Sequence, residues 1–99
     1  ESIHGTTPLF NACRNENENI IRYLVEHGAD VNKVCLYSTT PLFNACENAN
    51  ENIIKYLVEH GADVTIENSD GETPLDYVYF NRDKKNIENV IKYLKEHGA

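Results

Sequence analysis

Apolar residues along the chain fall in short groups separated by segments rich in Asn and Glu. The clearest group has the i, i+1, i+4, i+5 spacing of a single helix face and consists of Ile20, Ile21, Leu24 and Val25. A shorter apolar group over 9–13 predicts another helix just before it, and polar residues separate the two groups. The pattern therefore predicts a pair of helices joined by a short polar connection.

Residues that begin and end helices stand where this prediction needs them. Thr7 followed by Pro8 is typical of a helix start, because the Thr hydroxyl caps a free N–H and Pro has no N–H to leave unpaired. Asn17 or Glu18 can start the second helix. Gly28 suits the left-handed backbone that ends a helix. Both helix boundaries thus follow from local chemistry.

The chain repeats this pattern with a period of 33 residues, since Thr-Pro-Leu stands at 7–9, 40–42 and 73–75. Residues 7–31 and 40–64 agree at 22 of 25 positions. One helix pair cannot bury its apolar face alone, and about three stacked pairs are the minimum for a shared core. The sequence therefore predicts an all-α repeat array over the whole chain.

Motifs inside each unit match those of a known repeat family. The family's motif is Gly-x-Thr-Pro-Leu-His, then Ala, a turn, and a second helix ending in Leu-Leu-x-x-Gly-Ala-Asp-Val-Asn. This chain has matching residues at 5–9, Ala12, Leu24 and 28–32. On these residues it resembles the ankyrin-repeat family over essentially its whole length. The resemblance implies an ankyrin-type solenoid of antiparallel helix pairs stacked side by side, with short β-hairpin fingers that project at roughly right angles.

The resemblance divides the chain into repeats that form one continuous domain, namely 1–34, 35–67 and a longer, cap-like 68–99. In the last repeat Lys95 stands where the others have Val25 and Val58, and a polar outer face is what a capping repeat needs. The first unit has the same apolar face as the middle one. We therefore expect the chain to be the C-terminal part of a longer array.

Some residues depart from the family pattern. Phe10, Phe43 and Asp76 stand where the family usually has His, so we expect the side-chain hydrogen bond from that position to the turn to be absent from all three repeats. Ser38 replaces the Gly that usually precedes Thr-Thr-Pro-Leu. These positions are where the local structure is expected to differ from the family.

Charge narrows the classes of partner. Nine basic residues stand against sixteen acidic ones, for a net charge of −7. A phosphate backbone repels such a surface, so we expect no nucleic-acid partner. No apolar run approaches the roughly 18 residues of a membrane span, so we expect no membrane partner. We also expect the protein to be a monomer. The basic cluster 82–85 is interpreted as a solvated loop, with contact to an acidic partner as the alternative.

The three cysteines do not indicate a disulfide framework or a zinc site, because their number is odd and no Cys-x-x-Cys spacing occurs. Cys13 and Cys46 occupy equivalent positions in neighbouring units. Helices packed side by side lie about 8–10 Å apart, beyond the roughly 7 Å between Cα atoms that a disulfide spans. We expect buried free thiols, and an intracellular, cytoplasmic location.

The residues that suggest catalysis or metal binding have structural interpretations. His27, His60 and His97 each precede the Gly that ends a helix, where an imidazole can cap free carbonyl groups, and they lie along one edge without converging. The acidic segment 67–72 lacks the ligand series of an EF-hand. No phosphate-binding loop or nucleophile motif occurs. We therefore expect no enzyme activity, no cofactor and no metal.

The resemblance implies a protein–protein interaction module that binds through a concave face lined by the finger tips and the exposed side of the first helices. Carried over position by position, the candidate binding residues are Ile3, His4, Thr6, Arg14, Asn15, Leu36, Tyr37, Thr39, Glu47, Asn48, Ser69, Asp70, Glu72, Phe80 and Asn81. The identity of the protein partner stays open. The alternatives are a structural spacer in a larger ankyrin-repeat protein that binds elsewhere, and an accessory domain of an enzyme.

The arm between the first two units carries a run of four apolar residues where family arms are usually polar. We expect Val34 and Cys35 to be half-buried, and Leu36 and Tyr37 to lie nearer the tip as the best binding anchors if the tip is exposed. Phe80 is a third candidate anchor, although packing within the wider last repeat is the interpretation we favour for it.

Asn32 is a candidate modification site. Ankyrin repeats as a family can be hydroxylated on the Asn of Leu-x5-Asp-Val-Asn, and the segment from Leu24 to Asn32 matches that motif, whereas Thr65 replaces the Asn in the next unit. The alternative is that Asn32 has only a structural role in the turn.

Overall fold

Each Thr-Pro-Leu segment begins a short α-helix, and a longer helix follows each of them, as the sequence predicts. The computed structural model describes residues 5–81 and 86–99, so Ile3, His4 and the basic cluster 82–85 lie outside the described residues. Within these ranges the elements are α1 (Pro8–Arg14), α2 (Glu18–Glu26), the 3-10 helix η1 (Leu36–Ser38), α3 (Pro41–Glu47), α4 (Glu51–Glu59), α5 (Pro74–Tyr79) and α6 (Ile87–Glu96).

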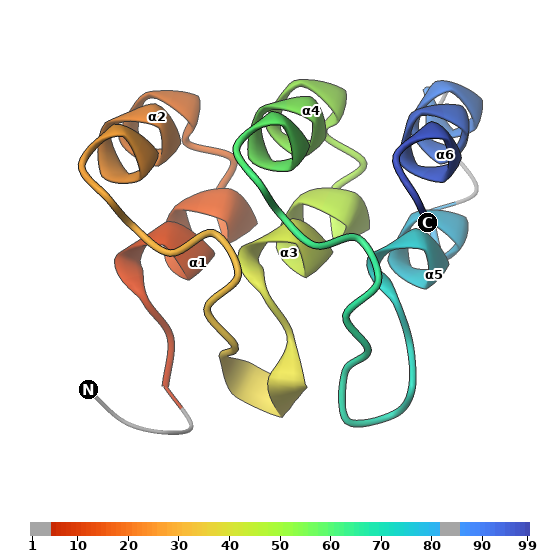
Figure 1. Ribbon diagram of the computed structural model, residues 1–99, viewed down its shortest axis with the longest axis horizontal. Helices are drawn as coiled ribbons and strands as arrows, with labels where there is room; N and C mark the ends of the chain where they lie inside the picture. Colours follow the sequence, from red (N-terminus) through yellow and green to blue (C-terminus); the bar gives the residue numbers. More distant parts are fainter. Residues whose placement is uncertain (1–4, 82–85) are drawn as a thin grey trace.

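The helices form two parallel rows (Figure 1). The first helices α1, α3 and α5 make one row and the second helices α2, α4 and α6 make the other, while long loops extend from the side of the first row. Neighbouring first helices contact one another, and so do the two helices of each pair. We call the pairs repeat 1 (α1 and α2), repeat 2 (α3 and α4) and repeat 3 (α5 and α6). The stacked helix pairs that the sequence predicts are present.

The expected β-hairpin fingers are not confirmed, because no residue in the ranges 5–81 and 86–99 is assigned to a strand. The two loops that extend from the first row are each closed instead by one short backbone hydrogen bond. In the first loop the N–H of Cys35 donates to the carbonyl of Thr39 at 2.7 Å, and in the second the N–H of Asn68 donates to the carbonyl of Glu72 at 2.8 Å. The arms are therefore closed loops in the described structure.

The starts of the first helices depart from the prediction in repeats 2 and 3, since the Thr40 side chain makes no capping hydrogen bond in repeat 2. The Thr7 hydroxyl accepts the N–H of Phe10 at 3.2 Å, which confirms the predicted cap. In repeat 3 the Asp76 carboxylate accepts the N–H of Thr73 at 2.9 Å, while the Thr73 hydroxyl accepts the N–H of Asp76. The prediction that the hydrogen bond to the turn is absent from all three repeats is thus wrong for repeat 3, because a carboxylate at this position completes a capping box.

The ends of the second helices are built alike. The Nδ1–H of His27 donates to the carbonyl of Tyr23 at 2.7 Å, and the two rings stack with centroids 4.1 Å apart. His60 and His97 make the same contacts with the tyrosines four residues before them. Gly28 follows with a φ of +95°, in the left-handed region. The predicted roles of these histidines and of Gly28 at helix ends are confirmed.

The core lies between the two rows of helices and runs through all three repeats. Cys13 and Cys46 are wholly buried in it as free thiols, as the sequence predicts. Burial raises the pKa of the Cys13 thiol to about 12 and raises that of Cys46 as well. Both cysteines therefore act as small apolar residues at neutral pH.

Asparagine side chains join consecutive repeats. Asn44 is buried and its amide donates to the carbonyl of Phe10 at 3.0 Å. The amide of Asn86 donates to the carbonyl of Ala49 at 2.8 Å in the same way between repeats 2 and 3. Phe10 lies in the first turn of α1 and Ala49 lies in the turn between α3 and α4, so each bond joins a side chain to the backbone of the repeat before it. Polar contacts therefore fix the stacking register in addition to the apolar core.

Candidate functional site

The tip of the first loop presents one aromatic side chain. Tyr37 has 79% of its surface exposed, the largest value among the large apolar side chains of the described residues. Its backbone is left-handed, with φ 57° and ψ 26°, and the next residue, Ser38, has φ 62°. A left-handed conformation is costly for residues other than Gly and persists only where the surroundings impose it.

Hydrogen bonds inside the loop impose this conformation. The carbonyl oxygen of Leu36 accepts the hydroxyl of Thr39 at 2.6 Å and the N–H of Thr39 at 2.9 Å. Both donors belong to a buried residue, so the loop is closed beneath the tip. As a result Tyr37 is held in the middle of the short 3-10 turn Leu36–Ser38 with its ring in solvent.

The second loop is organised around Asn68, whose side chain is buried. Its Oδ1 accepts the N–H groups of Asp70 and Glu72, both at 2.9 Å. Its Nδ2 donates to the Glu72 carboxylate at 3.0 Å and to the Tyr77 hydroxyl at 2.9 Å. One amide therefore fixes the loop and ties it to helix α5.

The two loops are joined to each other at their tips. The N–H and the hydroxyl of Ser69 both donate to the carbonyl of Tyr37, each at 3.0 Å. In Figure 1 the two loops lie side by side along the same edge of the molecule. The backbone that carries the Tyr37 ring is thus held from both loops.

Three carboxylates affect the hydroxyl of Tyr77, whose ring packs edge-on against that of Phe43 with centroids 5.0 Å apart. Burial raises the pKa of the Tyr77 hydroxyl, the hydrogen bond from Asn68 lowers it, and the negative charges that raise it further belong to Glu72, Glu47 and Asp70. Acidic groups from repeat 2 and from the second loop therefore converge on one region of the surface.

Phe80 lies at the end of α5 beside this acidic region. Its ring centroid is 5.5 Å from that of Tyr77, and 62% of its surface is exposed. The interpretation that Phe80 packs inside the last repeat is wrong, because most of its surface is exposed even though its ring lies tilted beside that of Tyr77. It is an exposed apolar side chain next to negative charge.

The other candidate binding residues differ in how much of their surface is exposed. Arg14, Asn15, Glu47, Ser69 and Asp70 are exposed, while Thr6, Leu36, Glu72 and Asn81 are partly covered. We call the exposed members of this set, together with Tyr37 and Phe80, the loop-side surface. It comprises Arg14, Asn15, Tyr37, Glu47, Ser69, Asp70 and Phe80.

Some expectations about these residues are wrong. Thr39 is buried, because its hydroxyl closes the first loop. Val34 is exposed and not half-buried, whereas Cys35 is buried. The apolar run thus has exposed residues at its two ends, Val34 and Tyr37, and covered residues between them.

Asn48 is partly covered and its amide donates to the carbonyl of Arg14 at 3.2 Å, so it joins two repeats. Its role in binding stays a prediction.

The amide of Asn32 bridges two repeats. Its Nδ2 donates to the carbonyl of Gly61 at 3.0 Å, and its Oδ1 accepts the N–H of Asp63 at 2.7 Å. The backbone N–H of Asn32 in turn donates to the Asp30 carboxylate at 2.8 Å. This structural role was not found from the sequence beyond the turn itself. Hydroxylation of Asn32 stays a prediction, and mass spectrometry for one added oxygen atom on this residue checks it.

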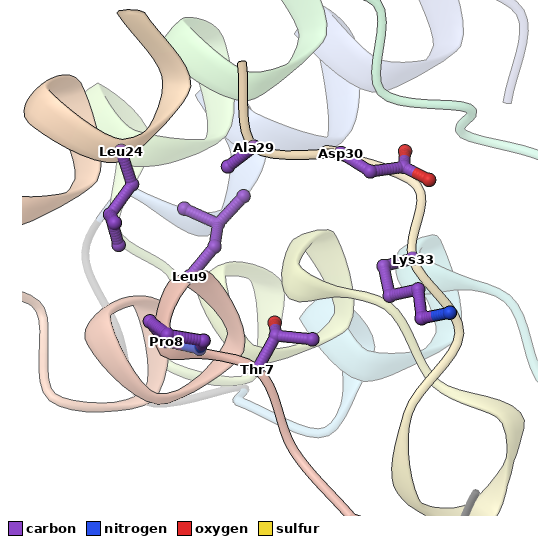
Figure 2. A pocket seen from close by; sticks show the side chains of 7 residues that line it. All are labelled: Thr7, Pro8, Leu9, Leu24, Ala29, Asp30 and Lys33. Atoms are coloured by element: carbon purple, nitrogen blue, oxygen red, sulfur yellow. The ribbon is translucent and has the colours of Figure 1, made fainter. Parts of the chain in front are cut away.

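A hollow lies at the outer end of repeat 1 and has a volume of about 290 Å³. Figure 2 shows Leu9 rising from α1 between Leu24 and Ala29, with Asp30 and Lys33 at the rim. The lining is mostly apolar, and the groups in it have no arrangement suited to acid–base or nucleophilic chemistry. Within residues 5–81 and 86–99 no cluster of His, Cys, Asp and Glu could hold a metal ion.

The stacked helix pairs with long loops on one side define a helical repeat protein. A family model described as ankyrin repeats in three copies matches residues 1–68 and again residues 35–99. The chain belongs to the ankyrin-repeat family, whose repeats generally mediate protein–protein interaction and are typically not enzymes. No curated protein matches the chain. Of the helices in the described residues, none is both long enough and apolar enough to cross a membrane.

Proposed function

We propose that the chain is a non-enzymatic module that binds a protein partner through the loop-side surface. The observation that carries the proposal is the exposed Tyr37 ring on a backbone that is held in place from two loops. Exposed apolar side chains on a surface that is otherwise polar are typical anchors of protein interfaces. Tyr is favoured among such anchors because it gives a large contact area and keeps a polar end.

The fixed backbone supports the same function. An anchor that is already held in its bound conformation loses less conformational entropy on binding than a mobile one. The hydrogen bonds from Ser69 and Thr39 around the Tyr37 turn provide this fixation. Tyr37 and Ser38 both have a left-handed backbone, which costs free energy. We propose that this cost is spent to hold the Tyr37 ring in an exposed position.

The charge of the loop-side surface indicates the chemistry of the partner. Phe80 lies beside a region where Glu47, Asp70 and Glu72 act together on Tyr77. A basic side chain on the partner complements these carboxylates, and the exposed face of an aromatic ring also attracts a cation. The partner surface opposite Phe80 is therefore proposed to be basic.

Photo-crosslinking tests the proposal. A crosslinking amino acid in place of Tyr37 or Phe80 is expected to capture the same partner protein from a cell extract. The matched control is the same substitution at Glu59, an exposed residue of α4 in the row of second helices. Equal capture from Glu59, or capture that does not fall at raised salt concentration from the Phe80 position, contradicts binding by the loop-side surface.

A further inference from the structure

The outer face of repeat 1 carries nearly the same side chains as the face of repeat 2 that packs on repeat 1. Residues 7–31 and 40–64 agree at 22 of 25 positions, so equivalent residues in the two faces can be compared directly. Ile20 is 44% exposed and its equivalent Ile53 is 1% exposed. Pro8 is exposed and its equivalent Pro41 is buried. The difference is that repeat 2 has a repeat before it in the structure and repeat 1 has none among the described residues.

The hollow in Figure 2 lies on this outer face and has a counterpart in repeat 2. Leu24 and Ala29, which line the hollow, are partly exposed, whereas their equivalents Leu57 and Ala62 are buried in the core. In repeat 2 the same surface is covered by repeat 1. The hollow thus has the composition of a helix-pair interface from which the other helix pair is missing.

Polar backbone groups on the outer face of repeat 1 also have equivalents on the face of repeat 2 that packs on repeat 1. Between repeats 1 and 2 the Asn32 amide bonds the carbonyl of Gly61 and the N–H of Asp63. The equivalent groups on repeat 1 are the carbonyl of Gly28 and the N–H of Asp30, and the structure gives neither of them a partner among the described residues. An amide from a preceding repeat can bond both in the same geometry.

A basic residue of each repeat lies over a tyrosine of the next. The guanidinium of Arg22 is 4.9 Å from the ring centroid of Tyr56, and the ammonium of Lys55 is 5.5 Å from that of Tyr93. Tyr23 occupies the same position in repeat 1 and is exposed. The outer face therefore lacks the cation that both equivalent tyrosines have.

We infer that the outer face of repeat 1 binds a further ankyrin-type helix pair with a basic residue at the position of Arg22 and an amide at the position of Asn32. The interface is continuous with the one that joins repeats 1 and 2, because its apolar surface, its backbone groups and its tyrosine are the same. This inference does not rest on the loop-side surface.

A second copy of the chain is a poorer occupant. Its repeat 3 offers Lys92 at the basic position, but Tyr79 and Lys95 stand where repeats 1 and 2, which each have a successor, carry Cys and Val. Both Tyr79 and Lys95 are exposed. Covering Lys95 without a charged partner costs free energy, and the larger Tyr79 does not fit a site shaped for Cys.

The test adds one repeat to the full chain. A copy of residues 7–39 inserted directly before Thr7 keeps the period of 33 residues and supplies both the basic residue and the amide. Docking is expected to slow amide hydrogen exchange in α2 (Glu18–Glu26) by at least about tenfold, which corresponds to about 1.4 kcal/mol. The enlarged chain is also expected to unfold in a single transition at a higher denaturant concentration.

The matched control is Ile20→Asp. It changes an exposed residue in the first turn of α2, where a carboxylate is tolerated, so the 99-residue chain is expected to keep its stability. In the enlarged chain the same substitution lies in the new interface and is expected to abolish the protection of α2. Equal effects of Ile20→Asp in both chains, or an inserted repeat that leaves exchange in α2 unchanged, overturn the inference. Concentration-dependent dimers of the 99-residue chain that Ile20→Asp dissociates overturn it in favour of a second copy.

Discussion

The carbonyl oxygen of Tyr37 accepts two hydrogen bonds from Ser69, one from the backbone N–H and one from the hydroxyl, each 3.0 Å long. The two residues lie at the tips of neighbouring loops and are 32 positions apart in the chain. This contact makes the conformation of the first loop depend on the second. It also explains how Tyr37 keeps a left-handed backbone while its ring remains in solvent.

Ser69→Ala removes one of these two bonds and leaves the backbone bond in place. We expect a loss of about 0.5–1.5 kcal/mol in the free energy of unfolding, which is typical of one hydrogen bond. Amide exchange at Tyr37 and Ser38 is expected to become faster. Glu67→Ala, at an exposed position in the same segment, is the control. Unchanged exchange at the first loop after Ser69→Ala contradicts the coupling of the two tips.

Ser38→Gly is expected to stabilise the protein. Ser38 has φ 62°, in the region where a side chain costs roughly 1–2 kcal/mol and Gly costs nothing. Since Gly also loses more chain entropy on folding, the expected net gain is about 0.5–1 kcal/mol, measured by denaturant unfolding. Ser38→Ala keeps the side-chain strain and is expected to give no gain. A lower unfolding midpoint for Ser38→Gly contradicts the strained geometry.

Much of the fold follows from the sequence because it is encoded locally. The Thr-Pro pair, the capping Asn and the Gly after each His specify helix ends within a few residues, and the 33-residue period specifies stacking. The exceptions among these local signals are Thr40 and Asn86, whose side chains make no capping hydrogen bond, and Asp76. The capping box of Asp76 depends on which hydrogen bonds a carboxylate makes in place of an imidazole, and the family pattern alone did not indicate this.

The candidate site is predicted less completely, because exposure of a loop residue depends on its loop conformation. Tyr37 is exposed, and its role as a binding anchor stays a prediction, whereas its neighbours Val34 and Thr39 have the opposite exposure to the one expected. The organising role of Asn68 was missed for the same reason, since its amide is satisfied by groups that only the folded loop brings together.

Alkaline pH is expected to destabilise the protein through its buried thiols. The pKa of Cys13 is raised by burial from its ordinary value of 9.0 to about 12, so the unfolded chain releases this proton first as the pH rises. The stabilising contribution is fully present below pH 9 and is lost between about pH 9 and 12, with a slope of up to about 1.4 kcal/mol per pH unit for each thiol.

Cys13→Ala tests this contribution, because it removes one titrating group. The variant is expected to be less stable at pH 7, owing to the smaller side chain, and to lose stability less steeply above pH 9 than the parent. In the parent, thiol reagents are expected to react with Cys13 and Cys46 only after unfolding, since both are wholly buried. An equal slope in the parent and the variant contradicts the assignment.

Asn32→Ala removes both bonds that its side chain makes to repeat 2, to the carbonyl of Gly61 and from the N–H of Asp63. We expect a loss of about 1–3 kcal/mol in the free energy of unfolding, because two backbone groups lose their partner at once. Asn32→Asp separates the two bonds, since a carboxylate still accepts the Asp63 N–H but has no hydrogen to donate to Gly61. It is expected to have an intermediate effect. Asn19→Ala, at an exposed position on α2, is the control, and an equal loss there contradicts the bridging role of Asn32.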